Sequence, residues 1–160
     1  MCYFKCTYTK EGIPISKKDF LPPVAECHCL NLRRLTLQTV EQYDQYVRPA
    51  GITIQQFSLM RHLHFLSPIS VTELAEAMGL DRTTLSRNLK VLEKKGLVCD
   101  DLPIGRQRQL MLSQEGQRVF AQAEALWQKA QHSFEDRLGP ERMAQLNEIL
   151  QLLLANSEEK

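Results

Sequence analysis

The sequence predicts a mainly α-helical fold that carries one small β-hairpin. Three observations support this prediction: apolar residues recur at helical spacing along most of the chain, two short amphipathic segments meet at a glycine, and a short hairpin pattern follows them. At 160 residues, 43% of them apolar, the chain can bury one core. We expect residues 30–160 to form a single domain, preceded by a cysteine-containing arm at residues 1–29.

The first expected helix covers residues 31–48. Its apolar side chains, Leu32 and Tyr43 among them, lie on one side, and Pro-Ala-Gly at residues 49–51 prevents its continuation. The unit that follows, residues 53–112, contains the most informative segment of the chain.

Two short helices are expected within residues 70–96. Ser70-Val-Thr-Glu73 has the sequence of a capping box, and Gly79 suits a tight turn between the helices. Asp81 is the expected N-cap of the second helix, and Gly96 is expected to end it in a left-handed conformation. Two capped helices joined by a tight turn are the outline of a helix-turn-helix.

The second of these helices has one apolar and one basic face. Leu85, Leu89 and Leu92 recur at i, i+4 and i+7 and are expected to be buried. Residues 82–96 include five basic residues and one acidic residue, although the whole chain carries a net charge of only +1. The polar residues lie where an inserted helix meets base edges and phosphates. The expected DNA contacts of this helix are Arg82, Thr83, Thr84, Ser86, Arg87, Lys90 and Lys94.

A β-hairpin is expected next, with strands at residues 97–99 and 109–112. Arg106 and Arg108 lie near its turn, where they would contact a backbone phosphate or the minor groove. A charged helix face by itself is usually only solvated. The order of a capped helix, a glycine turn, a basic helix and a basic hairpin favours a winged helix-turn-helix that contacts DNA.

Two more helices are expected at the C-terminus. Ser113 would cap a long helix that ends near Leu138, and Pro140 would start a last helix with apolar residues at 3, 4, 3 spacing. The winged unit cannot cover so much apolar surface, so we expect residues 30–50 and 113–157 to form a dimerisation region. The alternative is a monomeric helical cap folded back on its own wing. A twofold dimer holds its recognition helices about 34 Å apart, which predicts a pseudo-palindromic DNA site.

These segments resemble the MarR (multiple antibiotic resistance regulator) family of bacterial transcription factors from about Asn31 to Leu154. The similarity is strongest at Ile52-Thr-Ile-Gln-Gln-Phe57, at Leu74-Ala-Glu-Ala-Met-Gly-Leu-Asp-Arg-Thr-Thr-Leu-Ser-Arg87, at Leu92-Glu-Lys-Lys-Gly-Leu-Val98 and at Leu112-Ser-Gln-Glu-Gly116. The resemblance implies a homodimeric winged helix-turn-helix on palindromic operators, usually a repressor released by a small ligand or by thiol oxidation. The family's wing often carries Asp-x-Arg, and here Arg106 matches the Arg while Ile104 replaces the Asp. We therefore expect a wing less braced by an ion pair.

Four of the five cysteines lie in the arm. They are Cys2, Cys6, Cys27 and Cys29. Thiols near a helix N-terminus are candidate oxidant sensors, because a lowered pKa makes a thiol reactive. The alternatives are a soft-metal site, although the spacing matches no standard zinc module, and an arm with incidental cysteines. No metal is assigned. Cys99, in a predicted strand, is expected to be a small buried residue.

Composition and motifs exclude several classes of function. The sequence contains no Gly-rich phosphate loop, no His-Glu-x-x-His and no nucleophile elbow, so we expect neither an enzyme nor a cofactor. It contains no run of about 18 apolar residues and no signal-peptide pattern, so we expect a cytoplasmic protein without membrane contact. Four aromatic residues are candidates either for an effector pocket or for plain core. These are Tyr43, Tyr46, Trp127 and Phe134.

The sequence thus predicts a sequence-specific DNA-binding regulator. The expected form is a homodimeric repressor that leaves a palindromic operator on binding a small ligand or on cysteine oxidation. The expected partners are double-stranded DNA, a second copy of the chain and a small-molecule effector. The alternative is a winged-helix protein–protein adaptor, in which Arg87 and Lys90 face an acidic partner instead of phosphates.

Overall fold

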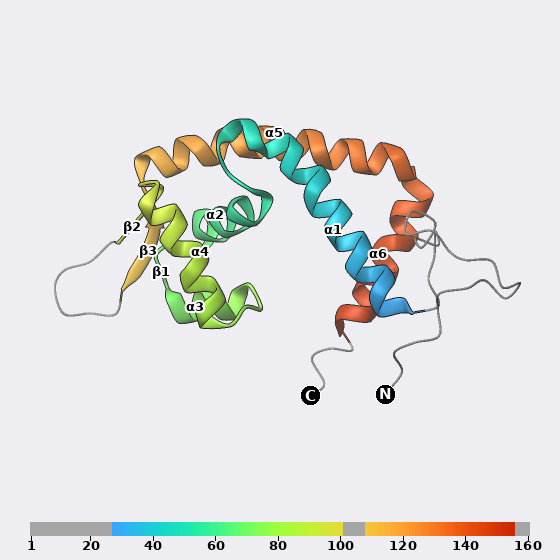
Figure 1. Ribbon diagram of the computed structural model, residues 1–160, viewed down its shortest axis with the longest axis horizontal. Helices are drawn as coiled ribbons and strands as arrows, with labels where there is room; N and C mark the ends of the chain where they lie inside the picture. Colours follow the sequence, from blue (N-terminus) through green and yellow to red (C-terminus); the bar gives the residue numbers. More distant parts are fainter. Residues whose placement is uncertain (1–26, 101–107, 156–160) are drawn as a thin grey trace, which may run out of the picture. The chain divides into compact units, whose positions relative to one another are not determined.

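The computed structural model describes residues 27–100 and 108–155. The chain forms two compact units, residues 1–39 and 40–160, and the first helix crosses their boundary. The elements in order are α1 (His28–Val47), the 3-10 helix η1 (Arg48–Ala50), α2 (Ile54–Leu66), β1 (Ile69–Ser70), α3 (Val71–Ala77), α4 (Arg82–Lys94), β2 (Val98–Asp100), β3 (Gln109–Leu112), α5 (Gln114–Leu138) and α6 (Pro140–Ala155) (Figure 1). The expectation of a mainly helical fold with a small hairpin is confirmed.

The three described strands form one antiparallel sheet in the order β1-β3-β2. The expected hairpin corresponds to β2 and β3, in which Cys99 lies opposite Met111. Strand β1 was not expected, because two residues are too few to show an alternating pattern; it pairs Ile69 with Leu110. The expected burial of Cys99 is wrong. Successive side chains of a strand point to opposite faces, and Val98 takes the buried face while Cys99 is exposed.

The core lies between α2, α3, α4, the sheet and the first half of α5 (Figure 1). The three leucines that α4 was expected to bury are almost fully covered, with Leu85 and Leu92 at 0% exposure and Leu89 at 2%. From α2, Phe57 packs in parallel with Phe120 of α5, with their ring centroids 5.6 Å apart. The apolar spacing of α4 therefore fixes which of its faces remains open to solvent.

The helix termini follow the expected capping residues. Ser70 and Glu73 form the capping box of α3, with the Ser70 Oγ accepting from the Glu73 backbone N–H and a Glu73 carboxylate oxygen accepting from the Ser70 backbone N–H. Ser113 caps α5, because its Oγ accepts from the Gly116 N–H at 3.0 Å and donates to the Gly96 carbonyl at 2.6 Å. This hydroxyl thus joins the end of the α4 segment to the start of α5.

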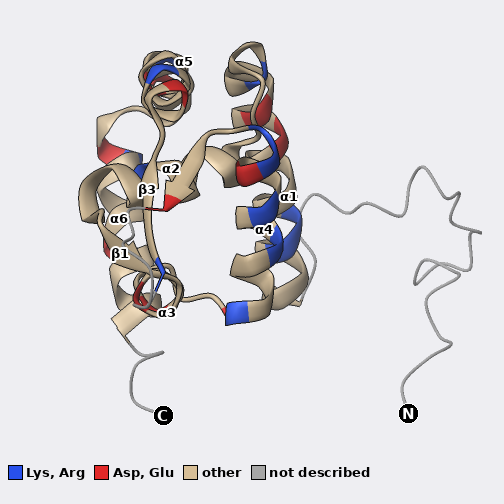
Figure 2. Cartoon of the chain, turned by 90° about the vertical axis from the view of Figure 1, so that its left-hand side faces the viewer, with Lys and Arg blue, Asp and Glu red and all other residues tan. Residues whose placement is uncertain are grey.

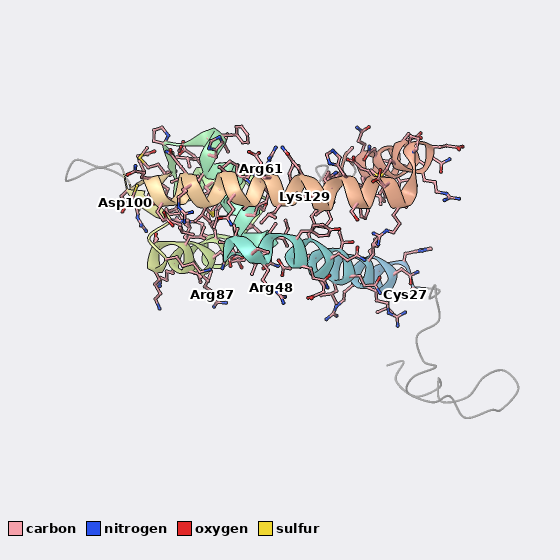
Figure 3. The ribbon with its side chains drawn as sticks, turned by 90° about the horizontal axis from the view of Figure 1, so that it is seen from above. Cys27, Arg48, Arg61, Arg87, Asp100 and Lys129 are labelled. Carbon is pink, nitrogen blue, oxygen red and sulfur yellow. The ribbon has the colours of Figure 1, made fainter. Side chains whose placement is uncertain are left out.

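Helix α2 is attached to α5 by a cationic side chain between two aromatic rings. The Arg61 guanidinium lies 4.9 Å from the Trp127 ring and 5.2 Å from the Phe65 ring, and its Nη1 is 2.9 Å from a Glu124 carboxylate oxygen (Figure 3). Trp127 also stacks on Phe57, with 5.8 Å between ring centroids. Arg61 thus stacks on aromatic rings and also forms an ion pair with Glu124. Both interactions hold α5 against α2 of the winged unit.

Large apolar side chains remain exposed on α6 and on the part of α1 within the first unit. Among the described residues 140–155, no residue of α6 is buried. The large exposed apolar residues of α6 are Ile149, Leu150, Leu152, Leu153 and Leu154. Within residues 27–39, four leucines of α1 are between 39% and 62% exposed. These are Leu30, Leu32, Leu35 and Leu37. Exposed patches of this kind on soluble proteins mark association surfaces.

Candidate nucleic-acid interface

Helix α4 is held at both ends by the residues that the sequence analysis selected. At its start, the Asp81 carboxylate accepts from the Thr84 backbone N–H at 2.9 Å and from the Thr84 hydroxyl at 2.6 Å. These hydrogen bonds lower the pKa of the Asp81 carboxyl below its usual value. Gly79 and Gly96, on either side of the helix, have φ values of 62° and 69°, a conformation that glycine adopts without steric cost.

The face of α4 opposite its buried leucines carries most of the expected DNA contacts. Five of these residues are exposed; Figure 2 shows Lys and Arg residues along α4, and Figure 3 labels Arg87. These five are Arg82, Thr83, Arg87, Lys90 and Lys94. Ser86 is half-buried, and the hydroxyl of the exposed Thr84 is engaged in the cap. The structure thus brings Arg87, Lys90 and Lys94 onto one helix face and gives Thr84 a local structural role.

Lys95 lies next to this face but has a different role. Its Nζ donates to the Gly51 carbonyl at 2.7 Å and to the Gln56 side-chain oxygen at 3.2 Å. Gln56 in turn completes the capping box of α2 with Thr53. The residue that follows α4 is thereby tied to the turn that precedes α2. From the sequence, Lys95 was expected only as part of the basic segment, because no local pattern indicates a partner 44 residues away.

The wing departs from expectation in how it is braced. Arg106 and Ile104 lie outside the described residues. Arg108 is described, and it binds two carboxylates: its Nε donates to Asp100 at 2.7 and 2.9 Å, and its Nη2 donates to Glu93 at 2.5 Å. The hydrogen bonds to Asp100 are the main reason that the pKa of Arg108 is raised. The wing therefore has an ion-pair brace, formed by residues other than the Asp-x-Arg pair.

The four candidate pocket aromatics fall into two groups. Tyr43, Tyr46 and Phe134 line a cavity of about 190 Å³ between α1 and α5, together with Arg137. The Tyr43 hydroxyl donates to the Gln131 side chain at 2.8 Å, and burial raises the pKa of Tyr43. Trp127 does not line this cavity, because it stacks on Phe57 in the α2–α5 contact.

The arm cysteines are only partly covered by the structure. Cys27 and Cys29 are exposed thiols at the start of α1, whereas Cys2 and Cys6 lie outside the described residues. Among the residues that the structure describes, no group of three or more His, Cys, Asp or Glu side chains is placed to hold a metal ion. In the same part of the chain, no helix is both long and apolar enough to cross a membrane.

Comparison with known proteins establishes the family. A model of the MarR family matches residues 50–103, which include α2, α3, α4 and β2. The homoprotocatechuate degradative operon repressor of Escherichia coli is 30% identical over 132 residues, covering 78% of this chain and 89% of the repressor. The chain belongs to the MarR family.

Solved MarR-family structures resemble the chain over most of its length. The M. tuberculosis transcriptional regulator MosR, in complex with DNA, is 30% identical with a TM-score of 0.68 over 83% of this chain and 99% of MosR. The repressor CouR bound to a 23-mer DNA duplex is 26% identical with a TM-score of 0.73, covering 81% and 93%. CouR bound to p-coumaroyl-CoA is 25% identical with a TM-score of 0.73, covering 84% and 94%.

These relatives confirm the winged helix-turn-helix fold of this MarR-family chain. They are DNA-binding transcriptional regulators and not enzymes, which agrees with the prediction from the sequence. The residues that the family model covers include the whole of α4, whose exposed basic face is the candidate DNA contact.

Proposed function

We propose that this MarR-family chain is a repressor that binds a pseudo-palindromic operator as a homodimer and leaves it in response to an effector or to thiol oxidation. The exposed face of α4 carries this proposal. It presents Arg87 and Lys90 to solvent on a helix whose opposite face is buried and whose start is capped by Asp81. MosR and CouR, which have similar folds, have been solved on DNA. Arginine in such a position pairs with guanine edges in the major groove.

The homodimer is proposed from the exposed apolar faces. Leu150, Leu152 and Leu153 of α6 are between 44% and 64% exposed, which is costly for a helix of a monomer in water. A second copy supplies the matching surface, because a twofold interface uses the same patch on both subunits. The recognition helices of such a dimer lie about one turn of B-DNA apart, which matches a pseudo-palindromic site.

The effector site is proposed at the cavity between α1 and α5. Aromatic rings of Tyr43, Tyr46 and Phe134 offer stacking surfaces, and the Arg137 guanidinium lies 5.4 Å from the Phe134 ring. This combination suits a small aromatic acid, with the ring stacked and the carboxylate paired with arginine. The volume of about 190 Å³ accommodates a single-ring compound and is below that of a typical drug-sized pocket.

Salt titration tests DNA binding against the adaptor alternative. With a fluorescent duplex from the region upstream of the chain's own gene, log affinity is expected to fall linearly with log salt, with a slope of about −0.9 for each phosphate neutralised. This dependence follows from counterion release by the cations of α4 and the wing. A protein that binds neither this duplex nor random DNA at low ionic strength would favour the adaptor.

Arg87→Ala tests whether α4 reads sequence. We expect the preference for operator over random DNA to fall by about 1 to 3 kcal/mol, because a base-pairing arginine is lost. Lys94→Ala is the matched control: it removes one exposed cation from the C-terminal end of α4 and should weaken binding to both duplexes alike. Anisotropy titrations of both variants with both duplexes give the four affinities. Equal losses on the two duplexes for Arg87→Ala would make this residue a phosphate contact only.

Oxidation of the arm thiols is expected to release the operator. Hydrogen peroxide should lower operator affinity of the wild-type protein, and the Cys27→Ser, Cys29→Ser double variant should keep its affinity. Cys99→Ser is the control, because Cys99 is an exposed thiol on the wing strand. Gel shifts with and without peroxide measure the effect. If peroxide released the operator from the double variant but not from Cys99→Ser, Cys99 would be the oxidant-sensing thiol.

A further inference from the structure

A carboxylate–guanidinium–carboxylate triad joins the recognition helix to the wing. It consists of Glu93 in the last turn of α4, Asp100 at the end of β2 and Arg108 just before β3. The separation in sequence is 15 residues from Glu93 to Arg108 and 8 from Asp100 to Arg108. Three elements that are consecutive in the winged unit therefore meet at one guanidinium.

The two carboxylates of the triad bind two different nitrogens of the guanidinium. Nε faces the two oxygens of Asp100 at 2.7 and 2.9 Å, and Nη2 faces an oxygen of Glu93 at 2.5 Å. The planar, rigid fork of arginine orients both carboxylates at once, which the single ammonium of a lysine does not do. The Glu93 side chain is 25% exposed, so this partner is the most protected from solvent.

We propose that Arg108 is a positioning residue that sets the wing relative to α4, and that it contributes to DNA binding through Glu93 and Asp100 and not as a phosphate ligand. This inference rests on the proposed function, since it assigns a role within DNA recognition. Phosphate would have to compete with two carboxylates already bound to the same guanidinium. The triad as a whole has a charge of −1, so it offers no net attraction to the DNA backbone.

The positioning role and the phosphate-ligand role predict opposite changes in operator affinity for one double variant. Glu93→Gln with Asp100→Asn removes two negative charges beside the DNA-binding surface. If Arg108 were a phosphate ligand, the released guanidinium and the lost repulsion would tighten operator binding. If Arg108 positions the wing, operator affinity falls in spite of the more favourable charge. We expect a loss of roughly two- to tenfold, the combined effect of two partly exposed ion pairs.

The control is Glu115→Gln with Glu141→Gln, which removes two exposed acids on α5 and α6 and should leave affinity unchanged. Arg108→Gln completes a mutant cycle. If Arg108 positions the wing, Arg108→Gln should lose as much operator affinity as the double variant, and the triple variant should lose little more. Hydrogen exchange of residues 98–100 and 109–112 without DNA should rise in each triad variant.

These readouts separate failure of the triad from failure of the proposed function. Equal or tighter operator binding by Glu93→Gln with Asp100→Asn overturns the positioning role. Unchanged hydrogen exchange in the strands also overturns it. A wild-type protein that binds no duplex refutes the proposed function, and the exchange experiment still decides whether the triad holds the wing to α4.

Discussion

Leu150→Glu with Leu153→Glu is expected to turn the protein into a monomer and to lower its operator affinity by about 10²- to 10⁴-fold. Both leucines are exposed on α6, at 44% and 52%, and in the proposed dimer they are covered by the second copy. Glutamates there would place charges in an apolar interface without partners. A monomer engages one half-site and loses the effective concentration that links the second. Sedimentation velocity and anisotropy on the same samples measure both effects.

The control for this variant adds the same charge elsewhere on α6. Ala144→Glu with Gln151→Glu changes two exposed positions outside the spacing that relates Leu146, Leu150 and Leu153. This protein should sediment as a dimer and bind the operator almost normally. The proposed dimer interface is wrong if the leucine variant remains a dimer, or if it becomes a monomer and keeps full operator affinity.

Gly116→Ala is expected to lower the free energy of unfolding by about 3 kcal/mol, at the upper end of overpacking effects. Gly116 is buried in the first turn of α5, and a Cβ there would lie 2.0 Å from the Leu97 carbonyl oxygen. This neighbour is backbone and is itself held by the Ser113 N–H at 3.0 Å, so it cannot move aside cheaply. Helix propensity alone predicts the reverse, a gain of up to about 1 kcal/mol. Urea denaturation of both proteins measures whether Gly116→Ala lowers or raises the free energy of unfolding.

Gly51→Ala is the control that introduces backbone strain without a steric clash such as the one expected at Gly116. Gly51 has a φ of 77°, and no heavy atom lies within 4 Å of the position that a Cβ would take, so an alanine there bears only the left-handed strain of about 1 to 2 kcal/mol. We expect this variant to be destabilised less than Gly116→Ala. A Gly116→Ala protein as stable as wild type would mean that α5 and the segment after α4 do not pack as closely as the structure shows.

Local patterns accounted for much of the fold and for most of the candidate site. Ser70, Asp81 and Ser113 cap the helices that they were expected to cap, because a capping hydrogen bond spans only three residues. The buried leucines of α4 and the bounds of β3 also followed from spacing alone. The exposed basic face of α4 is the consequence of that same spacing, so the exposure of Arg87 and Lys90 followed from the sequence.

The partners of side chains that make contacts far along the chain could not be predicted from local patterns. Arg108 was expected at a backbone phosphate or the minor groove, and in the structure it bridges Glu93 and Asp100. Lys95 contacts a carbonyl 44 residues away. Trp127 was a candidate for either the effector pocket or the core, and it packs on Phe57 and Arg61. A cation in a sequence has the same appearance whether it faces solvent, phosphate or carboxylate. Only the packing of the helices and strands against one another decides which group a cationic side chain contacts.

The sequence by itself determined the helices, their caps, the hairpin and the polarity of the recognition helix, because hydrophobic periodicity and capping act between residues a few positions apart. The tertiary structure alone decided which cations remain available for DNA, which aromatics share a cavity and which thiols are exposed. These properties depend on contacts between elements far apart in the chain, as in the guanidinium of Arg108 between helix and wing.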